Sequence, residues 1–109
     1  DRPTMTSPLD SCMSANRVVK FPCSIVDLPT PCLVVDLDVV EANCTSMIQR
    51  AATAGVALRP HVKTHKIPEI AAMQVGGDKS KGIVASTLAE VRFFASHLYT
   101  DITYSVPIS

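Results

Sequence analysis

The sequence contains no tryptophan and only two tyrosines, and it carries no excess of charge of either sign. Its ten Lys and Arg residues balance ten Asp and Glu residues, which argues against a general nucleic-acid or anionic-membrane binder. Tyr99 and Tyr104 are too few and too scattered to form a stacking platform for bases. The apolar runs are far shorter than the roughly 20 residues that a membrane-spanning helix requires. We therefore expect no nucleic-acid partner and no membrane association.

A secretion signal and a metal-binding cysteine pattern are also missing. The first residues lack a basic region followed by an apolar core. Cys12, Cys23, Cys32 and Cys44 form no CxxC pair and lack the spacing of a zinc site. Four cysteines could form disulfides in a secreted protein, but reduced thiols, partly in the core, are the simpler interpretation. We expect a cytoplasmic protein.

What is present is the composition of a globular protein, with 47% hydrophobic and 18% charged residues. A chain of 109 residues is one small domain or a piece of a larger one. It begins with Asp1 and ends directly after the apolar run ITYSVPI, so we expect a fragment. Residues 1–26 carry several prolines and no sustained period, which predicts a loose leader with at most a short helix. Residues 27–109 have the pattern of a folded domain.

The first half of that domain predicts a strand followed by a helix. Leu33–Val35 follows a Pro-Thr-Pro turn signal and has the composition of a short strand. Asp38 stands three residues before Glu41, a capping-box spacing, and opens a helix that ends at Gly55. The apolar face of this helix is expected to comprise Val40, Cys44, Met47, Ile48 and Ala51.

The second half continues the alternation. Val56–Leu58 begins a buried strand, and Pro68 opens a helix that should stop at Gly76–Gly77. GIVAST predicts a third strand, and Thr87 with Glu90 forms a second capping-box spacing. A last strand is expected in ITYSVPI. The buried face of the helix before it should comprise Phe93, Phe94 and Leu98. This order predicts α/β architecture with parallel strands.

The stretch RPHVKTHK concentrates cationic and imidazole side chains in a chain of zero net charge. If Leu58–His65 is extended, its side chains alternate between two faces. Buried strands of parallel sheets are normally apolar on both faces, so the charged face must look at water, a cleft or the mouth of a barrel. That face would carry Arg59, His61, Lys63 and His65, with Pro60, Val62 and Thr64 opposite.

Lys63 is the candidate nucleophile of this stretch. It lies at the carboxyl end of the strand, where functional side chains of barrels collect. Neighbouring cations and partial burial both disfavour an ammonium ion, and an uncharged lysine amine can form a Schiff base with a carbonyl. Histidines beside it could move protons near neutral pH. On spacing alone, a solvated basic loop with no chemistry remains an alternative.

Two rival motifs are weaker. His61 and His65 have the spacing of a metalloprotease HExxH, but Val62 stands where the glutamate must be. GGDKSKG has the glycine spacing of a phosphate-binding loop, but Ile83 follows Gly82 where that motif requires lysine. We interpret the second stretch as a turn that ends a helix.

Four segments resemble one enzyme family when they are taken together. TPCLVVDLDVVEAN, LRPHVKTHKIPEIAAMQ, GIVASTLAEVRFFA and DITYSVPI occur in the order seen in fold-type III pyridoxal-phosphate enzymes. The resemblance covers about residues 28–109 and is closest to the D-serine dehydratase and D-threonine aldolase branch. It implies the first three or so strands of a (β/α)8 TIM barrel of the alanine-racemase N-terminal type.

The resemblance also implies roles for individual residues. Lys63 matches the lysine that holds pyridoxal 5′-phosphate, and Arg59, His61, Thr64 and His65 would line the cofactor mouth. A lyase of this branch either eliminates the β-hydroxyl of D-serine, giving pyruvate and ammonia, or cleaves a D-β-hydroxy amino acid to glycine and an aldehyde. The first reaction is favoured here, and the second remains the alternative.

A full barrel has about 250 residues, so the resemblance also predicts what lies outside this sequence. The phosphate-binding cup and the ligands of a divalent metal, expected to be zinc, would belong to the rest of the parent protein. The parent would be a homodimer acting on a small D-amino acid. A non-catalytic cofactor-binding protein and a truncated, inactive product remain alternatives, and this chain alone should be inactive.

Overall fold

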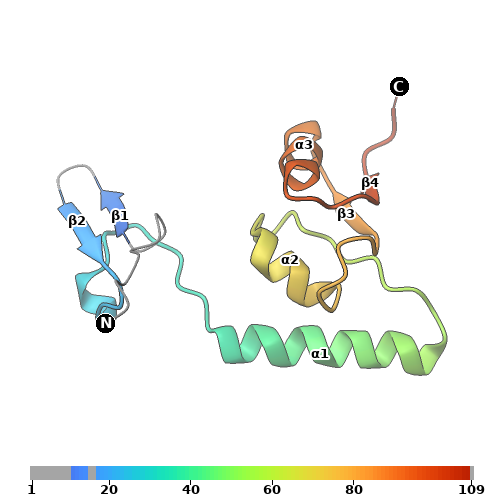
Figure 1. Cartoon of the computed structure of the whole chain (residues 1–109), viewed down its shortest axis with the longest axis horizontal. Coiled ribbons are helices and arrows are strands. Elements are labelled where there is room, and N and C mark those ends of the chain that lie inside the picture. Colours follow the sequence, from blue (N-terminus) through green and yellow to red (C-terminus); the bar gives the residue numbers. More distant parts are fainter. Residues whose placement is uncertain (1–10, 15–16, 109) are drawn as a thin grey trace, which may run out of the picture. The chain divides into compact units, whose positions relative to one another are not determined.

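The computed structural model describes residues 11–14 and 17–108, and the chain divides into two compact units, residues 1–35 and 36–109. The element labels of Figure 1 are used below. The first unit contains an antiparallel hairpin of β1 (Ser11–Ser14) and β2 (Arg17–Lys20), followed by a 3-10 turn, η1 (Ile25–Asp27). The predicted leader therefore contains a hairpin in place of a short helix, and residues 1–10 lie outside the described residues. The boundary at residues 26 and 27 stays a prediction.

The strand predicted at Leu33–Val35 is wrong. These residues belong to no strand, and no described residue pairs with them. Leu33 is 79% exposed and Val34 is 55% exposed. A β-branched apolar run favours a strand only where a neighbouring strand satisfies its backbone groups, and the described chain supplies none here.

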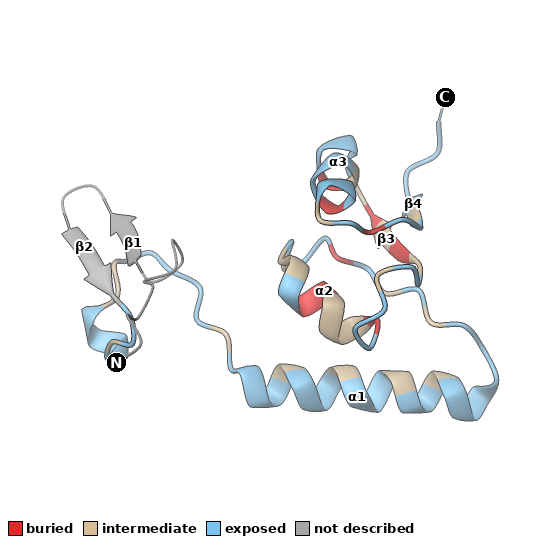
Figure 2. Ribbon diagram, viewed as in Figure 1, coloured by how far each residue is buried: buried red, intermediate tan, exposed pale blue. Residues whose placement is uncertain are grey.

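The second unit begins with α1 (Leu37–Ala54). Its N-cap is Asp36, whose carboxylate accepts a hydrogen bond from the backbone N–H of Val39 at 3.2 Å, so the predicted cap at Asp38 is two residues late. Gly55 ends the helix in the left-handed conformation, with φ of 67°, as predicted. Figure 2 shows half-buried residues along one side of α1. That side contains Val40, Cys44, Ile48 and Ala51, whereas Met47 is 47% exposed.

The sheet of this unit is parallel. β3 (Ile83–Ala85) pairs with β4 (Ile102–Tyr104), and His61 forms a single parallel bridge to Val84 on the other side of β3. This bridge is all that the structure retains of the long strand predicted from Val56 to His65. Val56 is 61% exposed, so the predicted burial at its start is also wrong.

Two helices cover one face of the sheet and begin where local signals predict. α2 (Pro68–Gln74) begins with proline in its first turn and is followed by Gly76 and Gly77, both at positive φ. α3 (Leu88–Ser96) is capped by Thr87, whose hydroxyl accepts a hydrogen bond from the N–H of Glu90 at 3.1 Å. α3 packs against β3 and β4, and α1 packs against α2.

The core lies between these helices and the sheet (Figure 2). Phe94 is fully buried, but Phe93 is 42% exposed and Leu98 is 73% exposed, so two of the three predicted buried positions on α3 are wrong. The predicted α/β class with parallel strands is confirmed for this unit. No helix in the described part of the chain is both long and apolar enough to cross a membrane. The core cluster comprises Val62, Ala71, Val75, Ile83, Ala85, Phe94 and Tyr99.

Candidate functional site

The strand register arranges polar side chains in rows on the open face of the sheet. Residues paired on parallel strands point to the same side, so His61, Val84 and Thr103 share a face. His61 and Thr103 are exposed, while Val62 and its neighbours on the opposite face belong to the core. The same register places three residues in a row nearer the amino ends of the strands, and a pair nearer the carboxyl ends. The row is Arg59, Gly82 and Asp101, and the pair is Ser86 and Ser105, whose hydroxyl oxygens are 3.4 Å apart.

Lys63 lies at the carboxyl end of this face, in a turn directly after the His61 bridge. The N–H of Lys66 donates to the carbonyl of Val62 at 2.9 Å and closes the turn. The predicted alternation of side chains therefore stops at Val62, and Lys63, Thr64 and His65 belong to the turn. Lys63 is exposed, and its ammonium group has no hydrogen-bond or ion-pair partner among the described residues. The partial burial that the sequence predicts for Lys63 is therefore wrong, and its role as a nucleophile stays a prediction.

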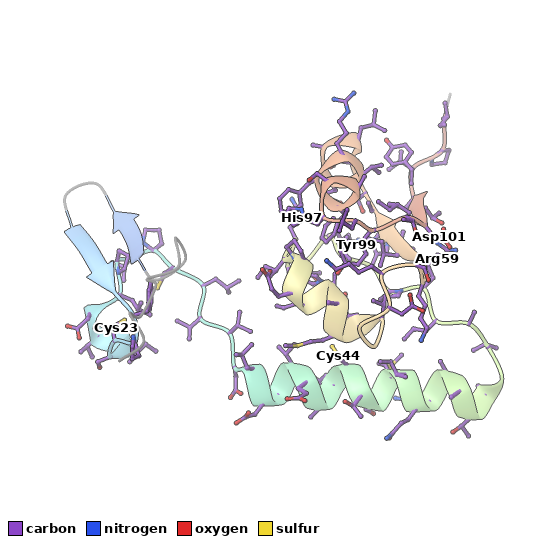
Figure 3. The ribbon with its side chains drawn as sticks, viewed as in Figure 1. Cys23, Cys44, Arg59, His97, Tyr99 and Asp101 are labelled. Carbon is purple, nitrogen blue, oxygen red and sulfur yellow. The ribbon has the colours of Figure 1, made fainter. Side chains whose placement is uncertain are left out.

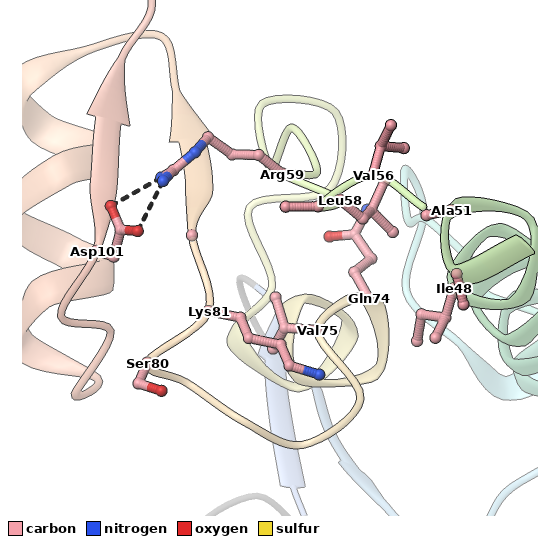
Figure 4. Close-up of a pocket in the computed structure, with 13 residues that line it drawn as sticks. Ile48, Ala51, Val56, Leu58, Arg59, Gln74, Val75, Ser80, Lys81 and Asp101 are labelled. Atoms are coloured by element: carbon pink, nitrogen blue, oxygen red, sulfur yellow. Dashed lines mark hydrogen bonds and ion pairs between the residues drawn. The ribbon is translucent and has the colours of Figure 1, made fainter. Parts of the chain in front are cut away.

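Arg59 lies at the other end of the strands. Its guanidinium donates to both carboxylate oxygens of Asp101, at 2.8 and 2.6 Å. Dashed lines mark the pair in Figure 4, and both residues are labelled in Figure 3. These hydrogen bonds hold the pKa of the Asp101 carboxyl below its usual value. A Cβ on Gly82 would overlap the guanidinium, so the missing side chain of the middle strand leaves room for this pair. The structure brings Arg59 to Asp101 and not to Lys63.

His65 has both ring nitrogens engaged. Its Nδ1 accepts a hydrogen bond from the N–H of Ile67 at 2.9 Å, and its Nε2 lies 3.1 Å from Oε1 of Gln74. The amide nitrogen of Gln74 donates to the carbonyl of His61 at 3.4 Å. Thr64 is exposed beside Lys63. Of the predicted site residues, the turn thus brings Lys63, Thr64 and His65 together, with His61 directly before it.

A buried carboxylate connects the turn to α3. Glu90 is 7% exposed, and its Oε1 lies 3.5 Å from the ammonium of Lys66. The backbone N–H of Ser86, which donates to Oε2 at 2.7 Å, is the main cause of a lowered pKa for Glu90, and Lys66 adds to it. Lys66 itself has a φ of 54°, a left-handed conformation that costs a non-glycine residue about 1 kcal/mol. The hydrogen bond from its N–H to the carbonyl of Val62 and the ion pair between its ammonium and Glu90 hold Lys66 in this conformation.

Two of the cavities among the described residues of this unit lie beside α1. One of about 440 Å³ is drawn in Figure 4 and is lined by Arg59, Gln74, Lys81 and Asp101 together with apolar residues of α1. Another of about 230 Å³ lies between α1 and Pro60. Lys63 and His61 line neither of them. No group of three His, Cys, Asp or Glu side chains in the described ranges could hold a metal ion.

Sequence reasoning missed three residues of this region: Gln74, Glu90 as a partner of Lys66, and Asp101. Asp101 is 42 positions from Arg59, so no local pattern connects them. Gln74 did carry a signal, because it is a polar residue at the end of the otherwise apolar helical run IAAMQV. A polar side chain on a packed helix generally has a partner.

The chain is similar in sequence to known dehydratases. No family model matches the chain. It is 46% identical over 89 residues to D-serine dehydratase of Dictyostelium discoideum and 42% identical over 87 residues to D-threo-3-hydroxyaspartate dehydratase of Delftia sp.. The solved structure of the Delftia enzyme superposes with a TM-score of 0.71 at 43% identity, over 77% of this chain. The resemblance to the dehydratase and aldolase branch is confirmed.

The match covers most of this chain but little of its relatives. It takes in 78% of the chain and 22% of the Dictyostelium enzyme, and 77% of the chain and 22% of the solved Delftia structure. A D-threonine aldolase of Arthrobacter sp. also matches, at 42% identity over 76 residues and 20% of its length. The chain therefore spans about one fifth of the proteins whose activities are named.

Proposed function

We propose that this chain is the amino-terminal part of a pyridoxal-phosphate-dependent lyase that acts on a D-β-hydroxy amino acid. D-serine, converted to pyruvate and ammonia, is the favoured substrate. The observation that carries the proposal is the free amine of Lys63 at the carboxyl ends of parallel strands, where barrel enzymes place their reactive groups. The named dehydratases that share its sequence support the same reaction.

We further propose that the His61 segment, β3 and β4 are the first three strands of a (β/α)8 barrel of the alanine-racemase N-terminal type. Their parallel order and the helices on one face support this. The open face, with its rows of polar side chains, would then be the barrel interior. Lys63 would stand at the mouth of that interior, with His61 one row below it.

The residues of the turn fit the cofactor. Pyridoxal phosphate, when bound, supplies an electron sink for charge that develops at the substrate Cα. Lys63 would hold the cofactor through its amine and, once released, would be placed to take the Cα proton. Thr64 and His61 are exposed on either side of it and would line the mouth. The phosphate group would be held by residues of the remaining barrel.

A divalent metal, expected to be zinc, and a homodimer complete the proposal for the parent protein. One solved form of the Delftia dehydratase is described as metal-free, which supports a metal in that enzyme. A metal ion would polarise the β-hydroxyl and make it a better leaving group. A cytoplasmic location is proposed on the same resemblance.

The test uses the full-length protein and borohydride reduction, which makes the carbon–nitrogen bond between a lysine and pyridoxal permanent. Peptide mass spectrometry should find the pyridoxyl group on Lys63. Lys63→Ala should lose the bound cofactor and at least about 10³-fold in kcat. Lys81→Ala is the matched control, because Lys81 is also exposed but precedes β3 at the amino end. A pyridoxyl group on another lysine, or a fully active Lys63→Ala variant, would refute the proposal.

A second candidate, D-threonine aldolase activity, is supported by the matched aldolase of Arthrobacter sp.. Product analysis separates the two reactions, since dehydration of D-serine gives pyruvate and ammonia, and aldol cleavage gives glycine and an aldehyde. A non-catalytic cofactor-binding protein would trap pyridoxal on Lys63 without turning over either substrate. A transcript that stops after Ser109 would indicate a truncated product and remove the proposal for this chain.

A further inference from the structure

We propose that His65 is a positioning residue, held by Gln74 as the neutral tautomer with its proton on Nε2, and that this pair fixes the turn carrying Lys63. The inference deepens the proposed function, on which its catalytic part rests. It replaces the role at the cofactor mouth that the sequence suggested for His65. It also gives a part in the site to Gln74, a residue of α2 that the sequence did not identify.

Three linked hydrogen bonds, from Ile67 through His65 and Gln74 to His61, determine which ring nitrogen of His65 carries the proton. The carbonyl of His61 can only accept, so the amide group of Gln74 must present its nitrogen there, at 3.4 Å. That leaves Oε1 facing Nε2 of His65 at 3.1 Å, and an amide oxygen can only accept. Nε2 therefore carries the ring proton. At the far end the N–H of Ile67 can only donate, so Nδ1 must present its lone pair, at 2.9 Å.

The same series shows why His65 is unsuited to carry protons. A second proton on Nδ1 would face the N–H of Ile67 and break that hydrogen bond. Ile67 is the N-cap of α2, and no side-chain oxygen caps this helix. The His65 ring therefore satisfies the backbone N–H of the N-cap residue itself, the donor that a glutamate or glutamine at N3 reaches in a capping box.

These contacts close a loop around Lys63. The chain leaves the sheet at His61, turns through Lys63, and returns at His65, while Gln74 bonds to both ends of the turn. The hydrogen bond from Lys66 to Val62 closes the turn from inside. Lys63 itself makes none of these contacts in the described part of the chain, so the turn can be rigid while its amine stays free. Small displacements of a reactive group of this kind cost up to about a hundredfold in rate.

The first test reads the tautomer directly, in full-length protein labelled with ¹⁵N-histidine and freed of cofactor. Long-range ¹H–¹⁵N correlation distinguishes the two neutral forms. His65 should show a protonated Nε2 and an unprotonated Nδ1, with its signal assigned by loss in His65→Asn. His97 is an internal reference with the opposite nitrogen protonated. Its Nδ1 lies 2.8 Å from the carbonyl of Phe93, so that nitrogen must donate. A His65 that is doubly protonated, or protonated on Nδ1, would overturn the inference.

The second test compares variants of the loaded full-length protein. His65→Asn keeps an acceptor near the position of Nδ1, whereas His65→Ala removes it. We expect His65→Ala and Gln74→Leu to lower kcat by about tenfold to a hundredfold, with KM changed by less than about threefold and the pyridoxyl group still trapped on Lys63. His65→Asn should have most of the wild-type kcat that His65→Ala loses. Its side-chain oxygen can accept the hydrogen bond from the N–H of Ile67, and no proton transfer by residue 65 is required.

The outcomes separate this inference from the proposed function. If His65→Asn is as slow as His65→Ala and both lose one limb of the pH–rate profile, His65 acts as an acid or base and the positioning role is wrong. If neither variant changes kcat, the turn does not depend on His65 and the inference fails as well. If Lys63 is not the trapped lysine, the proposed function fails, while the tautomer measurement still decides how His65 is held.

Discussion

Phe94 should be the most sensitive position of the α3 helix, and its neighbour Phe93 provides a matched comparison. Phe94 is fully buried, with its ring edge-to-face with that of Tyr99 at a centroid separation of 5.5 Å. Phe93 is the same residue type on the same helix, but it is 42% exposed. Because burial differs while chemistry and helix propensity are equal, the pair isolates the contribution of the core.

The magnitude follows from the buried ring. Truncation of a buried phenylalanine to alanine removes its transfer free energy and leaves a cavity, which together cost about 3–5 kcal/mol. Phe94→Ala should therefore lower the free energy of unfolding by that amount. Phe93→Ala should cost about 1 kcal/mol, because its ring keeps water contact and loses only its ring contacts with Phe94 and His97.

Urea denaturation of the full-length protein, followed by circular dichroism, measures both variants. With a denaturant slope of about 1–3 kcal/mol per molar urea, Phe94→Ala should move the midpoint of the transition by at least about 1 M. Phe93→Ala should move it by roughly a third as much or less. Equal shifts for the two variants would show that the core between α3 and the sheet is not packed as described, and would refute this account of the fold.

Two further predictions concern the ion pair at the amino ends of the strands. Gly82→Ala should displace the Arg59 guanidinium from Asp101 and lower the free energy of unfolding. The same change should lower it less in an Arg59→Ala background. A double-mutant cycle of urea midpoints measures the difference. The pKa of Asp101 is lowered in the folded state, so its contribution is present above the unfolded value of about 3.9 and is lost as the pH falls through the folded value. Acidification below about pH 4 should therefore destabilise the native protein more than an Asp101→Asn variant, and equal acid sensitivity would contradict the pairing.

Local interactions made part of this fold predictable from the sequence. Gly55 ends α1, Pro68 begins α2, and Thr87 caps α3, because each signal acts within one helical turn. The exception is the start of α1. Asp38 with Glu41 satisfied the capping-box pattern, but Asp36 is the cap, and a valine occupies the position where the box expects glutamate. A single carboxylate that reaches a backbone N–H is sufficient for capping, so the pattern selected the wrong aspartate.

Non-local interactions account for what the sequence could not show. Leu33–Val35 has strand composition without a strand partner, and the helical period alone could not distinguish buried Phe94 from exposed Phe93. Alternation along RPHVKTHK predicted one continuous charged face, but it fails where the Lys66 N–H bonds to Val62 and turns the chain. Lys63 was identifiable as the candidate nucleophile from its motif, and that role stays a prediction. Its supports, above all Gln74, depend on how α2 packs against the turn.

The row of Arg59, Gly82 and Asp101 bears on the barrel proposal independently of any family resemblance. In (β/α)8 barrels each interior layer is filled by side chains from alternate strands. Here the outer two of three adjacent parallel strands supply Arg59 and Asp101, and the middle strand supplies a glycine whose missing side chain gives the guanidinium its space. On the open face of an isolated sheet, a displaced guanidinium could move out into water. In the closed interior that we propose, side chains of the other strands would occupy that space, so a glycine at this position fits the barrel.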